Sequence, residues 1–598
     1  MASKKAVRIG GASGYWGDAA MATAQLLNAG DLDFIVYDYL AEITMAILAC
    51  MRARDANAGY AQDFVSAAMA PNLAEITKQG VRIISNAGGI NPDAAAKALR
   101  AEITRQGLDL SVAVVTGDDL MADLGAISDQ APVDMFSGRP LPEVAKIASV
   151  NAYLGAFPIA TALDRGADIV LTGRCVDSAV TLGAAIHHFG WSPHDLDQLA
   201  GGALAGHIIE CGPQATGGNF TDWAEVAETL DTIGYPIVEI EMTGNFTVSK
   251  PKETGGKVSV GTVAEQMLYE IGDPSHYLLP DIDCDFTRVE IANKGPDLVE
   301  VSGARGQRVP KHYKTCLTFE DGYRGGHLFS FYGLDAEAKA AAFAKAAFAR
   351  SRRILRQVNA PDFTETSVEL IGAESQFGVG RKSPSSRELA AKIAVKHPDP
   401  KGVGLFLKEA TGLGLATPPG LSGFAGARPK PSPVMALFSY LTPKADVQVE
   451  ISDAAGRVTY VAEHVPNKPA TAAPPEPNPP RAQGEIVAVP LIRLAFARSG
   501  DKGDSANIGV IARHADYLPW IWAALDVARI ERVFTHFLKG DVQRFVLPGS
   551  HAMNILMSGV LGGGGTSSLR NDPQGKGYAQ ILLAETIEID ASLLKDQT

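Results

Sequence analysis

The residues best suited to chemistry lie in AGHIIECGPQATGGNFTDW, residues 205–223. His207 and Glu210 are three residues apart, a spacing that lets a histidine and a carboxylate share one helical face. We predict a catalytic pair in which Glu210 holds His207 as a general base, with Asn219 binding substrate. A core histidine satisfied by a local acid is the alternative. A metal is not expected, since no second histidine follows at HxxxH spacing.

Charged residues also follow two apolar runs of the chain. In TGDDL the adjacent Asp118 and Asp119 repel each other, which a cation or a substrate contact would offset, so both are candidate acid–base groups. In TGRCVD, Arg174 presents a planar fork suited to a carboxylate or phosphate, and an ion pair with Asp177 is the alternative. Substrate-binding roles are predicted for Asn86, Arg174 and Asp177.

The opening loop VRIGGASGYWGD, residues 7–18, spaces its glycines as the dinucleotide loops of extended short-chain dehydrogenases do, and Asp38 ends the next apolar run. Those enzymes also need a helical Tyr-x-x-x-Lys pair. That spacing occurs from Tyr440 to Lys444, where Pro443 opposes a helix. We therefore favour a tight turn that contacts an anionic ligand over an NAD site. The contacts are predicted from Gly11, Ser13, Gly14 and Asp18.

Two stretches near the C-terminus combine glycines with charged side chains. ARSGDKGDSANIGV, residues 497–510, carries Arg498 and Lys502 in a turn that would hold a phosphate, with a plain charged hairpin as the alternative. Four glycines at 562–565 are followed by Arg570 and Lys576. Glycines let backbone amides approach a ligand, so we predict that this tail closes over an anionic substrate bound to the larger domain.

The elements that position these residues follow from hydrophobic patterning. Near-continuous apolar runs alternate with helical stretches over the first 180 residues, which predicts an α/β fold with a mainly parallel sheet and flanking helices. Loops at the carboxyl ends of such strands share one rim. We predict an α/β ligand-binding domain over 1–330, a continuous α+β subdomain over 331–464, a Pro/Ala-rich linker over 465–485, and a small α+β domain over 486–598.

Composition narrows the function class. The net charge of −13 disfavours a nucleic-acid or anionic-membrane surface. Five cysteines without a CxxC pair argue against a zinc ribbon or a disulfide framework. No apolar stretch approaches the ~18 residues of a membrane span, and no signal-like segment opens the chain. A cytoplasmic protein is expected.

Many of these strings together resemble the acyclic terpene utilisation, or AtuA-like, family. The large region is similar through GASGYWGD, DYLAE, NAGGINP, VTGDDL, NAYLGAFPIATALDRGADIVLTGR and AGHIIECGPQATGGNFTDW, and the tail through ARSGDKGDSANIGV and LGGGGTSSLRNDPQGK. The resemblance implies a large domain fused to a ferredoxin-fold domain. The family's association with breakdown of branched acyl-CoA compounds implies a CoA-thioester substrate.

We therefore expect a lyase of hydratase type acting on a branched or unsaturated acyl-CoA in terpenoid or branched-acid catabolism. His207 or an Asp118/Asp119 carboxylate would be the acid–base group, and Arg174 would hold the charged part of the thioester. No cofactor is expected beyond the coenzyme A of the substrate, and the chain is expected to form a homo-oligomer. The alternative is a non-catalytic subunit that binds acyl-CoA or scaffolds a catabolic complex.

Overall fold

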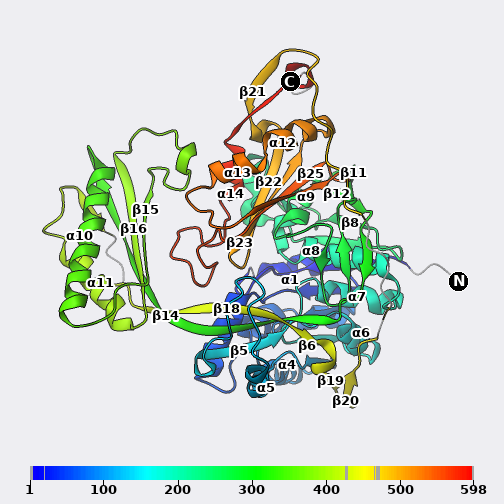
Figure 1. Cartoon of the computed structure of the whole chain (residues 1–598). Coiled ribbons are helices and arrows are strands. Elements are labelled where there is room, and N and C mark those ends of the chain that lie inside the picture. Colours follow the sequence, from blue (N-terminus) through cyan, green and yellow to red (C-terminus); the bar gives the residue numbers. More distant parts are fainter. Residues whose placement is uncertain (1–4, 19, 424–427, 464, 466–471, 595–598) are drawn as a thin grey trace.

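The computed structural model describes residues 5–18, 20–423, 428–463, 465 and 472–594. It has three parts: a main body built around a large sheet, an arm that projects from it, and a C-terminal domain (Figure 1). In Figure 1 the arm, with α10 and α11, lies to the left of the main body, and the C-terminal domain lies above it.

The main body is organised by an eleven-stranded sheet of order β11-β12-β8-β7-β1-β2-β3-β6-β4-β19-β20. Five central strands are parallel: β1 (Val7–Gly11), β2 (Phe34–Tyr37), β3 (Arg82–Ser85), β6 (Ile169–Thr172) and β4 (Val112–Thr116). Each of these strands coincides with a near-continuous apolar run within the first 180 residues, and the α/β class is confirmed. Antiparallel strands extend the sheet on both sides: β7 (Ile237–Ile240), β8 (Phe246–Ser249), β11 (Glu290–Gly295), β12 (Leu298–Ser302), β19 (Val449–Asp453) and β20 (Gly456–Tyr460).

Helices cover both faces of the central strands, which explains why those strands are apolar along their whole length. All four residues of β2 are buried. Apolar side chains pack on one face from α1 (Met21–Ala29), α2 (Glu42–Arg52) and α4 (Pro92–Gln106). They pack on the other from α6 (Phe157–Asp164), α7 (Ala179–Phe189), α8 (Leu196–Ile209) and α9 (Val260–Leu268).

The arm grows out of one long strand, β14 (His312–Tyr332). Its first half pairs with β5 (Ile147–Ala152) and β18 (Ser432–Pro443), and its second half with β16 (Glu388–His397), which pairs in turn with β15 (Glu365–Ile371). The predicted boundary at residue 330 falls inside β14, because one strand serves both parts. Helices α10 (Ala336–Gln357) and α11 (Pro400–Gly412) pack on the arm sheet. No helix in the described part of the chain is long and apolar enough to cross a membrane.

The C-terminal domain follows a stretch without regular structure over 472–485, while residues 466–471 of the predicted linker lie outside the described residues. Its sheet has the antiparallel order β22-β23-β25-β24, from β22 (Ala495–Lys502), β23 (Ser505–Ala512), β25 (Ala552–Met557) and β24 (Val542–Leu547). Helices α12 (Leu518–Ala524), α13 (Val527–Val533) and α14 (Tyr578–Leu583) share its core. β21 (Ile486–Pro490) pairs with β26 (Thr586–Asp590).

The C-terminal domain docks on α9 and on the segment that follows it. Gly509 of β23 lies so close that a Cβ there would be 2.4 Å from Leu268 Cβ. The Asn507 amide donates to the Leu268 carbonyl at 2.7 Å, and the Asn554 amide donates to the Ile271 carbonyl at 2.9 Å. This contact directs the turn between β22 and β23 toward the main body.

Candidate functional site

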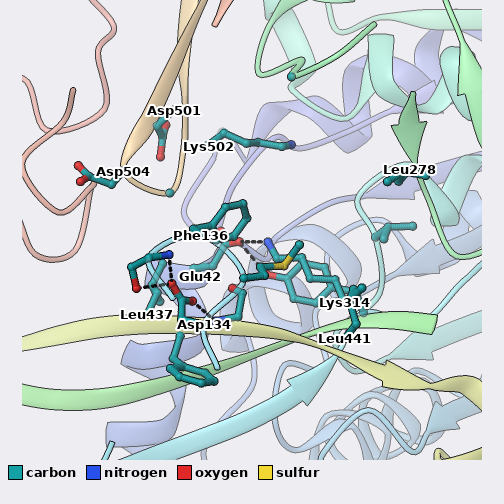
Figure 2. A pocket seen from close by; sticks show the side chains of 18 of the residues that line it. Glu42, Asp134, Phe136, Leu278, Lys314, Leu437, Leu441, Asp501, Lys502 and Asp504 are labelled. Carbon is teal, nitrogen blue, oxygen red and sulfur yellow. Dashed lines mark hydrogen bonds and ion pairs between the residues drawn. The ribbon is translucent and has the colours of Figure 1, made fainter. Parts of the chain in front are cut away.

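A cavity of about 1130 Å³ opens where the main body, the β14–β18 ribbon and the β22–β23 turn meet (Figure 2). Figure 2 shows Asp501, Lys502 and Asp504 of the turn on one side, and Glu42, Lys314 and Leu441 on the other. The lining comes mainly from five segments: residues 134–142, 276–280, 308–312, 436–439 and 501–504. The C-terminal domain thus forms one wall, to which Gly563 of the glycine-rich tail contributes, and closure of this tail over a substrate stays a prediction.

One wall carries a compact set of charged groups around Tyr153. Glu42, the first residue of α2, accepts hydrogen bonds at Oε1 from the Tyr153 hydroxyl at 2.7 Å and the Lys314 ammonium at 3.3 Å. The Tyr153 ring lies 4.1 Å from the Arg174 guanidinium and 4.8 Å from Lys314 Nζ. Burial alone would raise the pKa of Glu42, but Lys314, Arg174 and the Tyr153 hydroxyl lower it below its ordinary value. Glu42 is therefore held ionised.

Arg174 lies beneath this wall and reaches the cavity with Asp177. Its Nη1 donates to Asp177 Oδ1 at 2.6 Å and to the Cys175 carbonyl at 2.9 Å, so the alternative ion pair exists. The side chain is nearly inaccessible, and its Nε has no hydrogen-bond partner within the described residues. A buried guanidinium with an unused donor beside a cavity is suited to an additional polar contact with a ligand.

A second part of the cavity lining is apolar and exposed. It comes from the loop over residues 134–142 and from neighbouring strands. Phe136, Leu278 and Leu441 line the cavity, yet these residues are 58%, 59% and 53% exposed. The loop is fixed in place by Asp134, whose carboxylate accepts the Ser439 backbone N–H at 2.8 Å. The result is a preformed apolar surface inside the cavity.

The predicted pair of His207 and Glu210 is in contact but lies behind the cavity wall. Glu210 Oε1 is 2.9 Å from His207 Nδ1, and Nε2 is 3.1 Å from the Met267 carbonyl. His207 is only 1% exposed and is covered by Tyr277, whose ring centroid is 5.5 Å away. Burial raises the pKa of Glu210 to about 6, against the opposing effect of His207. Neither residue lines the cavity, so the alternative of a satisfied core histidine describes the contacts.

Asp118 and Asp119 diverge after β4. Asp118 is buried, and its Oδ2 accepts the Arg174 backbone N–H at 2.8 Å and the Asn151 amide at 2.9 Å. Burial raises the pKa of Asp118 to about 7. Asp119 instead forms an ion pair with Arg52 at 3.1 Å. Asp118 supports the Arg174 loop but does not line the cavity. The two loops that carry these residues therefore meet behind the cavity wall.

The opening loop closes on itself instead of reaching the cavity. A Cβ at Gly11 would lie 2.7 Å from the Ile209 carbonyl, so the glycine permits β1 to approach α8. The Gly14 N–H donates to Asp18 Oδ2 at 2.9 Å, and Asp18 Oδ1 accepts the Tyr235 hydroxyl at 2.7 Å. The loop is therefore a tight turn. The residues predicted to contact an anion there do not line this cavity.

Ser13 and Asn86 are engaged in a buried network beside that loop. The Ser13 hydroxyl donates to the Asp38 carbonyl at 3.0 Å. Asn86 accepts the Tyr39 backbone N–H at 2.7 Å, and its amide donates to the Asp38 carboxylate. Burial, followed by the charge of Asp177, raises the pKa of Asp38 well above its ordinary range. These side chains join neighbouring strand ends and do not line the cavity.

The predicted cations of the C-terminal domain split into two groups. Lys502 lines the cavity, with its Nζ 5.9 Å from the Tyr277 ring centroid. Arg498 instead donates to the Asn219 carbonyl at 2.7 Å, and Arg570 donates to main-chain carbonyls within its own domain. Lys576 does not line the cavity either, and its Nζ lies 3.3 Å from Glu270 Oε1 of the main body. Of the sixteen site residues predicted, the cavity lining contains Arg174, Asp177 and Lys502.

Sequence reasoning passed over the trio of Glu42, Tyr153 and Lys314. Glu42 stands in DYLAE directly after β2, where a first-turn acid has an ordinary explanation in the helix dipole. Tyr153 and Lys314 are brought together by the pairing of β5 with β14, which no local spacing reveals. The usable signal was the position of DYLAE at the carboxyl end of a parallel strand.

Comparison with family models now adds an independent finding. The model described as acyclic terpene utilisation family protein AtuA matches residues 7–452. The chain belongs to the AtuA family. The AtuA ferredoxin-like domain matches residues 489–588, so the resemblance seen in the motifs is confirmed for both parts. This family is implicated in acyclic terpene utilisation, which is consistent with terpenoid catabolism. Searches of curated proteins and of solved structures each found no match.

Proposed function

We propose that the cavity binds a branched or unsaturated acyl-CoA thioester and that this AtuA family protein is a lyase of hydratase type, adding water to the acyl chain or removing it. The observation that carries the proposal is the lining itself. Phe136, Leu278 and Leu441 expose apolar surface within the same cavity as Arg174 and Lys314. A thioester with a hydrocarbon chain and an anionic carrier has this same division of polarity.

Size and electrostatics support this ligand class. A cavity of about 1130 Å³ exceeds the ~300–1,000 Å³ of common small-molecule sites, as a long ligand requires. Within the described residues Lys502 forms no salt bridge, and its Nζ lies 5.9 Å from the Tyr277 ring centroid, so its charge is available to a phosphate. Arg174 adds a buried donor. The carboxyl groups that share the cavity supply candidates for proton transfer.

A non-catalytic acyl-CoA-binding or scaffolding role is the second candidate. It is favoured by the internal pairing of the charged wall, where Glu42 pairs with Lys314 and Arg174 with Asp177. Paired charges preorganise a binding surface without requiring turnover. The two candidates share the ligand and differ in whether it is transformed.

Calorimetry and an activity assay separate these functions. The full chain is titrated with 3-methylcrotonyl-CoA and with free coenzyme A, and hydration is followed by loss of the conjugated thioester absorbance. We expect saturable binding that is tighter for the acyl form, because the apolar wall contributes only when the chain is present. Lys314→Met should weaken binding, while Lys345→Met, a change to an exposed residue on α10, should not.

The binding and turnover measurements distinguish the two candidate functions. Binding with turnover supports the lyase, and binding without turnover of any enoyl thioester tested, in either direction, supports the binding subunit. Equal affinity for coenzyme A and its acyl form would remove the role given to Phe136, Leu278 and Leu441. No binding of either compound would overturn both candidates.

A further inference from the structure

Glu270 and Asp501 face the cavity from different domains at the point where those domains touch. Lys576 contacts both: its Nζ is 3.3 Å from Glu270 Oε1 and 3.6 Å from Asp501 Oδ1. The Gln574 amide also donates to Asp501 Oδ1 at 3.3 Å. Two carboxyl groups from separate domains therefore meet at one ammonium group, and both line the cavity.

The backbone holds this pair in an unusual way. Glu270 has a φ of 59°, in the left-handed region that a non-glycine residue seldom adopts. Gly500 presses against it, since a Cβ there would lie 2.7 Å from Glu270 Cγ and 2.6 Å from the Tyr269 ring. Strained residues of this kind cluster at functional sites, where the surroundings over-determine them. The turn of the C-terminal domain is thus seated directly on Glu270.

The environment of this pair changes the protonation of Asp501. Burial raises the pKa of Asp501 to about 7, the charges of Glu270 and Glu42 act in the same direction, and Lys576 opposes them. Glu270 lies nearer to the Lys576 ammonium and forms the closer ion pair. Near neutral pH Asp501 is therefore close to half protonated, and Glu270 lies beside it, at the same Lys576 ammonium.

We infer that Glu270 and Asp501 are the acid–base pair that acts on the acyl chain in this cavity, one from each domain. The inference deepens the proposed hydratase-type function and rests on it. In hydration the Glu270 carboxylate takes a proton from water as the water oxygen bonds to Cβ. The electrons of the Cα=Cβ double bond move to the thioester carbonyl as an enolate, and Asp501 then gives its proton to Cα.

The total number of protons on the two carboxyl groups stays the same during hydration. Glu270 ends with the proton from water and Asp501 ends ionised, so exchange with solvent restores the starting state, and dehydration runs the same steps in reverse. Lys576 is a positioning residue, because it holds both carboxyl groups without lining the cavity. Neither domain alone contains the pair. This gives the fusion of the two domains in one chain a chemical consequence.

The test uses the full chain with Asp501→Asn and Glu270→Gln, and with Glu531→Gln, an exposed residue of α13, as the matched control. The kcat for hydration of 3-methylcrotonyl-CoA and the Kd for the same compound are measured. We expect kcat to fall at least ~100-fold in both site variants with Kd changed less than about threefold, since general acid–base groups contribute ~10²–10⁴. The control should match the wild type.

A second readout follows from protonation. The wild-type pH–rate profile should show a limb near pH 7 that the residual activity of Asp501→Asn lacks. If Glu270→Gln does not fold, Asp501→Asn carries the test alone. A kcat within tenfold of wild type in Asp501→Asn overturns the acid–base assignment and leaves the lyase standing. A wild-type protein that does not bind or does not transform the thioester overturns the proposed lyase, and the pair with it.

Discussion

Two loops of this protein look alike in sequence and behave differently in the structure. The opening loop, residues 11–18, and the β22–β23 turn, residues 501–504, both combine glycines with acidic residues. In the first, Asp18 accepts hydrogen bonds from Gly14 and Tyr235. In the second, Asp501, Lys502 and Asp504 line the cavity.

The acids of both loops accept hydrogen bonds, so the two loops differ in where they lie relative to the cavity. The opening loop follows a parallel strand inside its own domain, so neighbouring strand ends satisfy it. The β22–β23 turn projects from a domain whose contact with α9 lies farther back along the same strands, at Asn507 and Gly509. The β22–β23 turn therefore lines the cavity, while contacts farther along β23 fix the position of its domain. Substitutions at Gly509, at Asp118, and at Ser13 and Lys502 test this difference.

Disturbing the support of the second loop should have the largest effect. Gly509→Val places a branched side chain where even a Cβ would lie 2.4 Å from Leu268 Cβ. Overpacking of this kind costs ~1–3 kcal/mol of unfolding free energy, and displacement of the turn should weaken acyl-CoA binding at least ~10-fold. Chemical denaturation and calorimetry measure the two effects. Gly125→Val, at a helical site with open space, is the control, and unchanged affinity in Gly509→Val would separate the docking contact from the site.

Much of the frame supporting both loops follows from local sequence. The five central strands coincide with apolar runs, and α4 begins at Pro92, because burial on both faces and proline at a helix start leave local marks. The spacing of His207 and Glu210 predicts their contact correctly. What local pattern cannot provide is the pairing of β14 with strands from three parts of the chain. That pairing brings Lys314 to the charged wall.

The acid–base pair illustrates the same limit. The two sequence-based interpretations of residues 497–510, a phosphate-holding turn and a charged hairpin, give Asp501 no catalytic role. Its environment is set instead by Glu270 and Lys576, which are distant from it in sequence. Burial that depends on another domain cannot be read from the residues beside Asp501.

Replacing the buried, ionisable Asp118 with asparagine should have an intermediate effect that depends on pH. Burial raises the pKa of Asp118 from an ordinary 3.8 to about 7, so the native state holds a proton that the unfolded state releases. Stability from this group is present below about pH 4 and is lost as pH rises toward 7. Between pH 5 and pH 8 the wild type should lose ~2–3 kcal/mol relative to Asp118→Asn, at ~1.4 kcal/mol per pH unit. Urea denaturation of both proteins at the two pH values gives this difference, and a constant difference would contradict the burial of an ionisable Asp118.

The smallest expected effect addresses the two loops directly. Ser13→Ala removes one hydrogen bond to the Asp38 carbonyl and should lower the free energy of unfolding by ~1 kcal/mol. Acyl-CoA affinity should not change, because Ser13 does not line the cavity. Lys502→Met should do the opposite: stability stays within ~0.5 kcal/mol, since the side chain is exposed, while affinity falls by a few fold. That loss should shrink at high salt, where an exposed charge is screened. Denaturation and calorimetry on both variants at low and high salt measure the four quantities. If Ser13→Ala weakened binding as much as Lys502→Met, the opening loop would belong to the ligand site, and the distinction between a turn that closes on itself and one that faces a ligand would fail.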